Sequence, residues 1–530
     1  VAFGSNNKAT GPQAFAMGSQ TTASGQGSVA MGLNTVAGGL GSVALGSDAQ
    51  ANGDFSFSMG TDGSIANGLG SVAFGSSQAD GPFSTAFGTN NQVSGGYAVG
   101  GGSDVTVTGA FAVAFGTSLL ASGNSSFAVG AGNKATGDWS IAMGTDAFAT
   151  DDGAVAVGLG ASASGRGSVS IGTGTSAEAD YSVAMGLGSQ TYQRASIAMG
   201  DACSTNGLAA FAAGTASHAN ANHSVAIGNG ATANGVGSVA LGVDCSTYGE
   251  AAFTMGTGNN ATGANSVALG AESTSPGDYS FVFGSYSHST GDFSFVGGAS
   301  STASGDYSVA LGLNLQATGD YSFAAGSNNG AAGVFSIVMG TNSHANGNYS
   351  VAIGSGATAS GDFDVALGSG STSSGGGCFS GGIGSHATGA QSVALGTGST
   401  AQGAQSAAFG AETLASGQAS VAMGGKTTAS GSYSVAMGSE TLAQGQRSFA
   451  MGASCNATGD YSVALGLGTY ATADQAFAMG SGSIADGVNA VAIGGGCNAS
   501  GFQSVALGGG SEASGHGSVA MGDDSTASGK

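Results

Sequence analysis

A glycine recurs every fourteen residues along almost the whole chain. It closes the string Ser-Val-Ala-Met/Leu/Ile/Phe-Gly at Gly4 and then at each fourteenth position to Gly60, and again at each fourteenth position from Gly88 to Gly522. Between Gly60 and Gly88, a step of fifteen residues to Gly75 and a step of thirteen cancel, which gives 38 closing glycines in all. A short, regular period is typical of a solenoid, in which each repeat forms one coil.

Each repeat consists of two halves of seven residues, and the second type of half reads Ser/Thr-x-Ala-Ser/Thr-Gly, as in Thr427 to Gly431. Its mid-repeat glycine is present in 33 of the 38 coils, and the exceptions are Asp151, Ala179, Gln193, Ala221 and Ala473. Glycine at the end of nearly every half indicates a tight turn with positive φ or a close backbone approach. A helix is excluded because each interior glycine would cost about 1 kcal/mol and because the apolar spacing is two. We therefore predict an all-β parallel solenoid with two short strands per coil.

Composition agrees with a repeat protein and excludes several other classes. Glycine makes up 105 of 530 residues and proline only 3, without the three-residue period of collagen. The 41% of apolar residues are too many for a disordered linker. Because 7 Lys and Arg stand against 29 Asp and Glu, for a net charge of -22, we expect no nucleic-acid partner and no binding to anionic membrane surfaces. No apolar run of about eighteen residues is present, so we expect no membrane insertion of this segment.

Alternation along the strands predicts which side chains face inward. In the first strand, Val435 and Met437 lie on one face, and Ser434 and Ala436 lie on the other. In the second strand, Ala429 shares a small face with the mid-repeat glycine. We expect the two small faces to meet inside a thin roll, with the Val/Met face and a Thr/Ser face pointing outward. The alternative places Val and Met inside, opposite the hydroxyl side chains.

An outward Val/Met face repeated over 38 coils would form a continuous apolar stripe. A soluble monomer rarely exposes a patch of more than a few hundred Å², so we expect another copy of the chain to cover the stripe. Examples of the expected oligomer interface are Val309, Leu311, Val351, Ile353, Val435 and Met437.

The whole of residues 1–530 is expected to form one continuous solenoid segment. Coils stacked at about 4.8 Å would give a rod of roughly 180 Å. Both ends of the sequence fall inside a repeat without a polar cap. Because solenoid ends need caps, we expect the parent chain to continue in both directions.

The motif Ser-Val-Ala-Ile-Gly followed by x-x-Ser/Asn-x-Ala-x-Gly resembles the head repeat of YadA-like trimeric autotransporter adhesins. Good instances are Ser224 to Gly228, Ser266 to Gly270 (preceded by Asn265) and Ser350 to Gly354. The resemblance extends over essentially the whole chain. It implies a left-handed parallel β-roll, a homotrimer, an extracellular or cell-surface location, and adhesion to host matrix, glycan or cell-surface ligands. The chain shows no neck sequence, heptad stalk or membrane-anchor barrel, and similar repeats also suit phage tail fibres, where the location would be a virion.

Seven consecutive coils carry an aromatic residue at one position, and these residues are Tyr279, Phe293, Tyr307, Tyr321, Phe335, Tyr349 and Phe363. At strand spacing they would form a ladder. The functional interpretation is a strip that binds carbohydrate or a partner, and the structural interpretation is a ladder that supports a corner of the coil.

An acidic column stands beside the aromatic positions, at Asp278, Asp292, Asp306, Asp320 and Asp362. Neighbouring carboxylates could recruit Ca²⁺, which takes oxygen ligands. Alternatively, they form a solvated column that caps N–H groups of the turns.

The remaining candidate groups predict no site. Four cysteines, Cys203, Cys245, Cys455 and Cys497, share one column at least three coils apart, and Cys378 lies elsewhere in the repeat, so we expect free thiols. Four histidines, His218, His288, His344 and His386, precede the second-strand Ala position and are several coils apart, which disfavours a metal site.

The sequence therefore favours a structural and adhesive fibre rather than an enzyme, with no cofactor and with itself as the first partner. The alternatives are a phage tail-fibre shaft and an ice-binding solenoid. The irregular outward column at Lys8, Thr22, Val36, Gln50, His218 and Leu414 argues against ice binding. A polysaccharide-cleaving enzyme on a long β-helix would need clustered acidic and basic side chains, and the sequence shows no such cluster.

Overall fold

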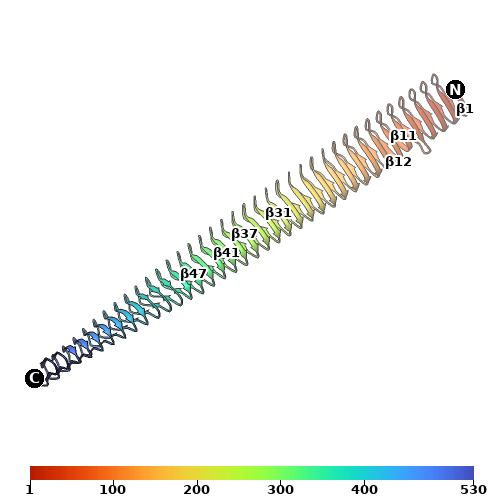
Figure 1. Ribbon diagram of the computed structural model, residues 1–530. Coiled ribbons are helices and arrows are strands. Elements are labelled where there is room, and N and C mark those ends of the chain that lie inside the picture. The colour runs from red at the N-terminus through yellow and green to blue at the C-terminus, as the bar shows by residue number, and fades with distance from the viewer. Residues whose placement is uncertain (530) are drawn as a thin grey trace. The chain divides into compact units, whose positions relative to one another are not determined.

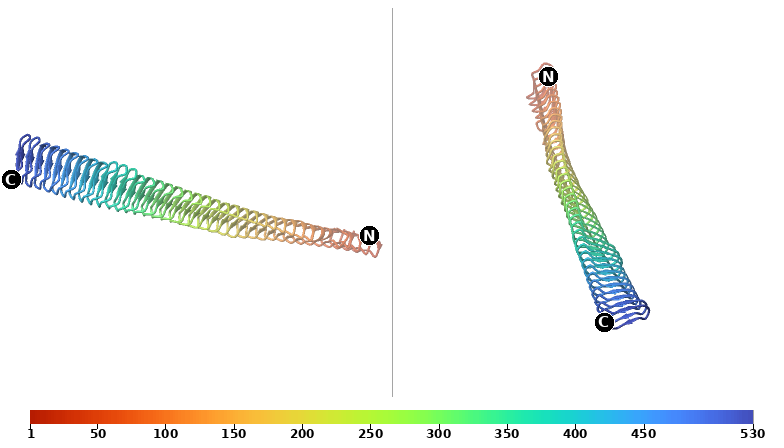
Figure 2. Two further views of the ribbon diagram at one scale, coloured as in Figure 1. Left: turned by 90° about the horizontal axis from the view of Figure 1, so that it is seen from below. Right: turned by 90° about the vertical axis from the view of Figure 1, so that its left-hand side faces the viewer.

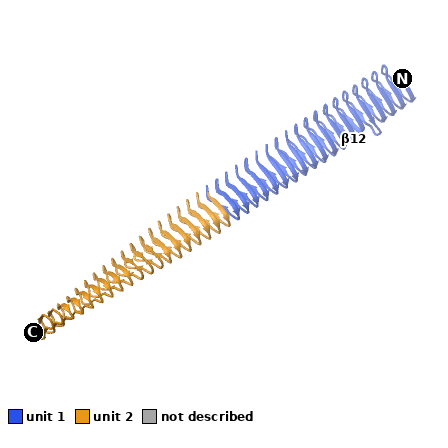
Figure 3. Ribbon diagram, viewed as in Figure 1, with its two compact units in different colours: residues 1–265 blue, residues 266–530 orange. Residues whose placement is uncertain are grey.

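A computed structural model describes residues 1–529 of the chain. It contains two compact units, residues Val1–Asn265 and Ser266–Lys530 (Figure 3). Within each unit, consecutive coils follow one another in chain order (Figure 1, Figure 2). Across the described residues there are strands and turns but no helix, and hence no helix that is long and apolar enough to cross a membrane.

Nearly every coil contains one longer strand and one strand of two residues. Strands labelled in Figure 1 are β1 (Ala2–Ser5), β11 (Val72–Ala79), β12 (Thr85–Val93), β31 (Val225–Asn229), β37 (Val267–Ala271), β41 (Phe295–Ala299) and β47 (Ile337–Thr341). A regular coil is represented by β61 (Val435–Ser439) and β62 (Leu442–Ala443). The prediction of two short strands per coil is confirmed.

Neighbouring coils pair in parallel with a register of fourteen residues. Between β59 (Val421–Gly425) and β61, Val421 pairs with Val435, Ala422 with Ala436 and Met423 with Met437. Each residue type therefore lies beside its own equivalent in the next coil, which is why a column in the sequence becomes a column in space.

The interior is built from small side chains, as predicted. Ala429, Ser434 and Ala436 are all fully buried. Val435 and Met437 lie on the opposite face and are only partly buried. The alternative with valine and methionine inside the roll is wrong, because Val435 and Met437 face outward, and the interior is lined mainly by alanine, serine and threonine with single larger residues such as Val338 and Leu315.

Both proposed reasons for glycine occur, and they apply to different positions. The closing glycine Gly438 has a φ of 118°, and a Cβ there would overlap the carbonyl oxygen of Gly452. The mid-repeat glycine Gly431 has no positive φ, but a Cβ would overlap the carbonyl oxygen of Gly445. The first glycine is favoured by both conformation and space, and the second by space alone, which five coils relax to hold Asp151, Ala179, Gln193, Ala221 and Ala473.

The irregular steps in the sequence are absorbed near the start of unit 1. Strand β9 (Phe57–Gly60) has four residues, and β11 and β12 run on through the corner where other coils turn. Gly75 pairs with Gly88, and a register shift between Ser76 and Gln78 restores the regular pairing of the second strand. The insertion and the deletion therefore cancel in the structure as they do in the sequence.

The corner after the closing glycine carries short polar ladders. In unit 1, Asn34 Nδ2 donates to Asp48 Oδ1 at 2.6 Å, and Asn90 Nδ2 donates to Asp104 Oδ1 at 2.6 Å. These hydrogen bonds hold the pKa of Asp48 and of Asp104 below its usual value. The ionised carboxylates therefore stabilise this corner above their ordinary pKa, and the contribution is lost as the pH falls through the lowered pKa.

All five thiols should be unreactive in the folded protein. The five cysteines are free and buried, which confirms the prediction of free thiols. Burial raises the pKa of Cys203 and of Cys245, so these two thiols form even less thiolate at pH 8 than a free cysteine does. Titration with Ellman's reagent should show no rapid phase in the folded state and five thiols per chain after denaturation. Rapid stoichiometric labelling of the folded protein would contradict the burial of these five thiols.

Two interior serines should respond differently to removal of the hydroxyl group. Ser308 Oγ donates to the carbonyl oxygen of Gly305 at 2.6 Å, whereas the buried Ser434 Oγ has no hydrogen-bond partner among the described residues. Ser308→Ala should lower the local free energy of opening by about 1 kcal/mol, and Ser434→Ala should leave it unchanged or raise it. Hydrogen exchange of the two coils measures both values, and equal losses in the two variants would argue against the difference.

Candidate functional site

The seven aromatic residues Tyr279 to Phe363 occupy one corner of seven consecutive coils in unit 2. Each lies two positions after a mid-repeat glycine, and we call this position in all coils the corner column. At Tyr307, for example, Ser308 N donates to Gly305 O at 3.2 Å and Tyr307 has a φ of 57°, which describes a type II turn with the aromatic residue at its third position. The turn projects the ring away from the coil.

Aromatic residues hold this position at a conformational cost. Left-handed backbone costs an L-residue roughly 1–2 kcal/mol, and the third position of a type II turn favours glycine. In other coils the corner column is indeed glycine, as at Gly377 and Gly517, with φ of 66° and 67°. Ala195 and Ala419 adopt the same φ (57° and 51°) without a ring, so the turn does not require an aromatic residue, and the consecutive rings add an interaction of their own.

That interaction is stacking between coils. Neighbouring ring centroids lie 4.6 to 5.2 Å apart, with interplanar angles of 2 to 11°. The rings remain between 43% (Phe335) and 63% (Phe363) exposed. Because each ring covers the faces of its neighbours, the ladder presents ring edges to solvent. Free ring faces, which a sugar ring would need for stacking, exist only at the two ends, Tyr279 and Phe363.

The acidic column beside the ladder binds the backbone of the turns. One oxygen of Asp292 accepts the N–H of Asp278 at 2.9 Å, and Asp306 and Asp320 accept the N–H of the preceding coil at 2.9 and 3.0 Å. This geometry matches the capping interpretation. No group of three or more His, Cys, Asp or Glu side chains suited to a metal ion occurs within residues 1–529.

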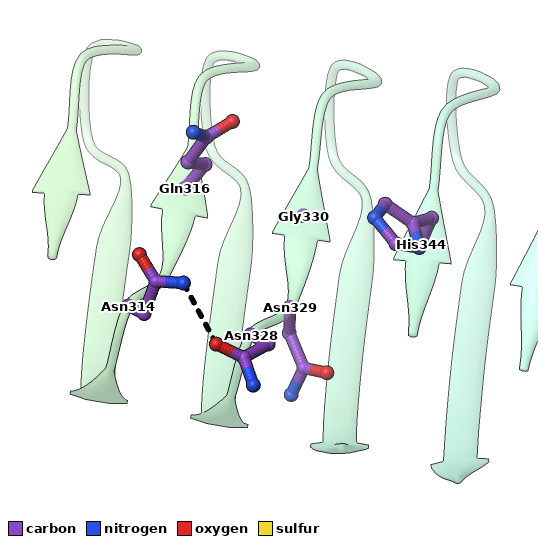
Figure 4. Close-up of a pocket in the computed structure, with 6 residues that line it drawn as sticks. All are labelled: Asn314, Gln316, Asn328, Asn329, Gly330 and His344. Carbon is purple, nitrogen blue, oxygen red and sulfur yellow. Dashed lines mark hydrogen bonds between the residues drawn. The ribbon is translucent and has the colours of Figure 1, made fainter. Parts of the chain in front are cut away.

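The histidine column provides only a shallow hollow. In Figure 4, Gln316, Gly330 and His344 follow one another on successive short strands, and Asn314 donates to Asn328 at 2.7 Å below them. The hollow of about 180 Å³ exists because Gly330 lacks a side chain between Gln316 and His344. It contains no pair of groups positioned for acid–base chemistry.

The expected interface residues all lie on the outward face of the first strand. Val309, Val351 and Val435 are partly buried. Leu311 and Ile353 are 39% and 38% exposed, and Met437 is partly buried. Parallel pairing places them in two columns, which we call the apolar stripe. The stripe consists of the residues three places and one place before each closing glycine, such as Val435 and Met437 before Gly438.

The apolar stripe differs sharply from the other outward face. In all 38 repeats, neither column of the stripe contains a charged residue. The outward position of the short strand, in contrast, includes Lys8, Lys134, His218 and Glu512. Both faces point away from the same interior, so outward position alone does not exclude charge. The exclusion of charge is therefore a property of the apolar stripe and not of outward faces in general.

The corner column continues beyond the seven residues predicted from the sequence. In unit 1, Phe83, Tyr97 and Phe111 stack at 5.1 and 5.2 Å. In unit 2, the Arg447 guanidinium lies over the rings of Tyr433 and Tyr461. All these residues stand two positions after a mid-repeat glycine, and this spacing identifies them in the sequence. The pattern is visible only when the column is allowed to contain arginine and to be interrupted by other residues.

Comparison with known families agrees with the resemblance noted from the sequence. The family model described as YadA head domain repeat (2 copies) matches the chain repeatedly, from residues 1–21 to residues 513–530, and the longest unmatched stretches are residues 105–120, 190–205 and 372–386. A comparison with curated proteins found no match. With a family model that covers most of its length and a structure made of fourteen-residue parallel coils, the chain belongs to the YadA head repeat family.

Proposed function

We propose that this segment is part of a homotrimeric, extracellular adhesin fibre in which the apolar stripe of each copy packs against the other two. The observation that carries the proposal is the stripe: its two columns exclude charge over the whole chain and yet point away from their own coil. Families with YadA head repeats are adhesins of trimeric autotransporters, which supports three copies.

Burial of the stripe between copies explains the residue choice at each position. Valine, methionine, leucine and phenylalanine gain roughly 25 cal/mol for each Å² of apolar surface that leaves water. A rotation axis parallel to the columns would bring equivalent residues of every coil together, so one repeat motif would satisfy the whole interface. In this proposal the fourteen-residue register, which continues through residues 265 and 266, makes the chain one continuous solenoid.

The outward surfaces that remain would provide adhesion to matrix, glycan or cell-surface ligands. A repetitive fibre presents many weak sites, so avidity rather than a single strong site would retain it on a surface. A phage tail-fibre shaft would share the same coil and stripe. An ice-binding face would need a regular outward column, and the short strands carry residues as different as Lys134, Phe148 and Ser162 there.

Retention of coated beads tests the adhesive function. Beads that carry the full chain at several surface densities would be passed over immobilised matrix proteins and glycans. We expect the fraction of retained beads to rise more steeply than in proportion to the surface density of the chain. Control beads coated with an unrelated protein of similar charge should not show this rise. Beads that are not retained on any of these surfaces would refute adhesion and leave a structural fibre shaft.

A further inference from the structure

One rung of the corner column shows how this protein binds a planar cation. Arg447 lies between Tyr433 and Tyr461, with its guanidinium carbon 5.7 and 5.4 Å from the two ring centroids. Arg447 Nη1 also donates to Tyr461 Oη at 3.1 Å. The three residues have φ of 59°, 56° and 58°, so the guanidinium occupies the place of a ring in the ladder.

A second arginine, Arg194, stands one residue before the corner column and lies over a ring of that column. The Arg194 guanidinium carbon lies 5.6 Å from the centroid of the Tyr181 ring, beside a rung where the corner residue is only Ala195. The chain has three arginines, Arg166, Arg194 and Arg447, and two of them thus lie on rings of the corner column. A planar, weakly hydrated guanidinium is well suited to stacking on an aromatic face.

In unit 1, the same backbone presents two rings with a small residue between them. Phe111, Ser125 and Trp139 are consecutive rungs of the corner column, with φ of 60°, 57° and 55°. Ser125 N donates to Ala110 O at 2.7 Å and Trp139 N donates to Asn124 O at 2.8 Å, so the coils are stacked here as elsewhere. The two rings are attached two coils apart, or roughly 10 Å by strand spacing, as are the two tyrosines around Arg447.

The exposure of these rings agrees with free inner faces. Phe111 and Trp139 are 60% and 66% exposed, whereas Tyr433 and Tyr461, which enclose Arg447, are 51% and 48% exposed. The outer face of Phe111 is covered by Tyr97, with ring centroids 5.2 Å apart. Ser125 is itself exposed at the floor of the slot.

The surroundings of the slot favour a cation. Asp138 Oδ1 accepts the N–H of Asn124 at 2.7 Å, and Asp152 Oδ1 accepts the N–H of Asp138 at 3.0 Å, which places both carboxylates beside Trp139. The nearby Lys134 ammonium lies 5.4 Å from the centroid of Phe148, on the short strand. The whole chain adds a net charge of -22.

We propose that the slot formed by Phe111, Ser125 and Trp139 binds a guanidinium group, presented by an arginine side chain of a partner polypeptide. The cation would take the rung that Arg447 takes in its own coil, stacked between the two rings and near Asp138 and Asp152. A free arginine would offer the same group, but its carboxylate would face these two aspartates.

Fluorescence of Trp139, the only tryptophan of the chain, reports on the slot directly. Titration of the full protein with N-acetyl-L-argininamide at constant ionic strength should give a saturable change, with half-saturation on the order of millimolar. N-acetyl-L-lysinamide should bind at least fivefold more weakly because it lacks a planar group. Free L-arginine should also bind several-fold more weakly, and equal binding would point to the free amino acid as the ligand and overturn the peptide source. Equal responses to the arginine and lysine derivatives would overturn the guanidinium site.

Three variants separate the slot from other positions near Trp139. Ser125→Arg would fill the rung from within and should abolish the response, and Phe111→Ala should weaken binding at least fivefold. Phe83→Ala removes a ring that stacks on Tyr97 and lies outside the slot, so binding should be unchanged. Unaltered binding in Ser125→Arg or in Phe111→Ala, with folding confirmed by circular dichroism, would overturn the proposal.

Discussion

Gly438→Ala should destabilise its coil by about 3–5 kcal/mol, the largest effect that we expect from any single substitution. The φ of 118° at Gly438 is strained for any residue with a side chain, and the new Cβ would overlap the carbonyl oxygen of Gly452. The overlapping atom belongs to a strand that is paired in register, Gly438 with Gly452, so it has no room to move. Hydrogen exchange across residues 421–453 would measure the loss locally, which suits a repeat protein without a single global transition.

Two glycines nearby provide matched controls. At Gly425 no atom lies within 4 Å of an added Cβ, and the paired position is Ser439, so Gly425→Ala should change stability by less than about 0.5 kcal/mol. Gly431→Ala should have an intermediate effect, because the added Cβ overlaps the next coil but φ is ordinary, and the chain itself has Ala179, Ala221 and Ala473 at this position. Equal losses at Gly438 and Gly425 would contradict the account of the closing glycine.

Three charges in the apolar stripe should weaken the assembly and leave the individual coil intact. The variant Met423→Lys, Met437→Lys and Met451→Lys alters three consecutive coils at side chains that point outward. In the proposed trimer each lysine would be buried against equivalent lysines without a partner, which costs several kcal/mol per site. Sedimentation velocity in increasing urea should show dissociation at a lower concentration than for the unaltered protein, and strand content by circular dichroism should be retained.

The matched control places the same charges on the other outward face. Thr372→Lys, Thr400→Lys and Thr428→Lys lie on short strands, at the position that already holds Lys8 and Lys134. This variant should dissociate at the same urea concentration as the unaltered protein. Equal behaviour of the two triple variants would show that the stripe is not an interface.

Much of the fold can be predicted from the sequence because the repeat motif has a period of fourteen residues and uses few residue types at each position. Alternation at Val435, Ala436 and Met437 predicted the buried alanine, and the closing glycines predicted the turns. The conformation of the corner column was not predictable, since aromatic residues at Tyr307 and its equivalents contradict the preference of a left-handed turn for glycine. Backbone pairing between coils holds even Ala195 and Ala419 in the left-handed conformation, and the stacking of the rings depends on a register that only the structure gives.

The candidate site was predicted less completely for a related reason. The seven aromatic residues were found because they are consecutive in the repeat. The Tyr433–Arg447–Tyr461 stack and the Phe111–Ser125–Trp139 slot interrupt the aromatic pattern with a cation or a small residue, so a search for aromatic runs misses them. The small residue Ser125 can be recognised as a gap between two rings only once the side chains of this column are known to point outward.

Sedimentation equilibrium of the purified chain tests most directly whether the outward Val/Met columns are covered by other copies. A mass near three times that of one chain, 49.5 kDa, should persist down to submicromolar concentration. A folded protein that sediments with the mass of a single chain, and shows no tendency to associate, would contradict the account.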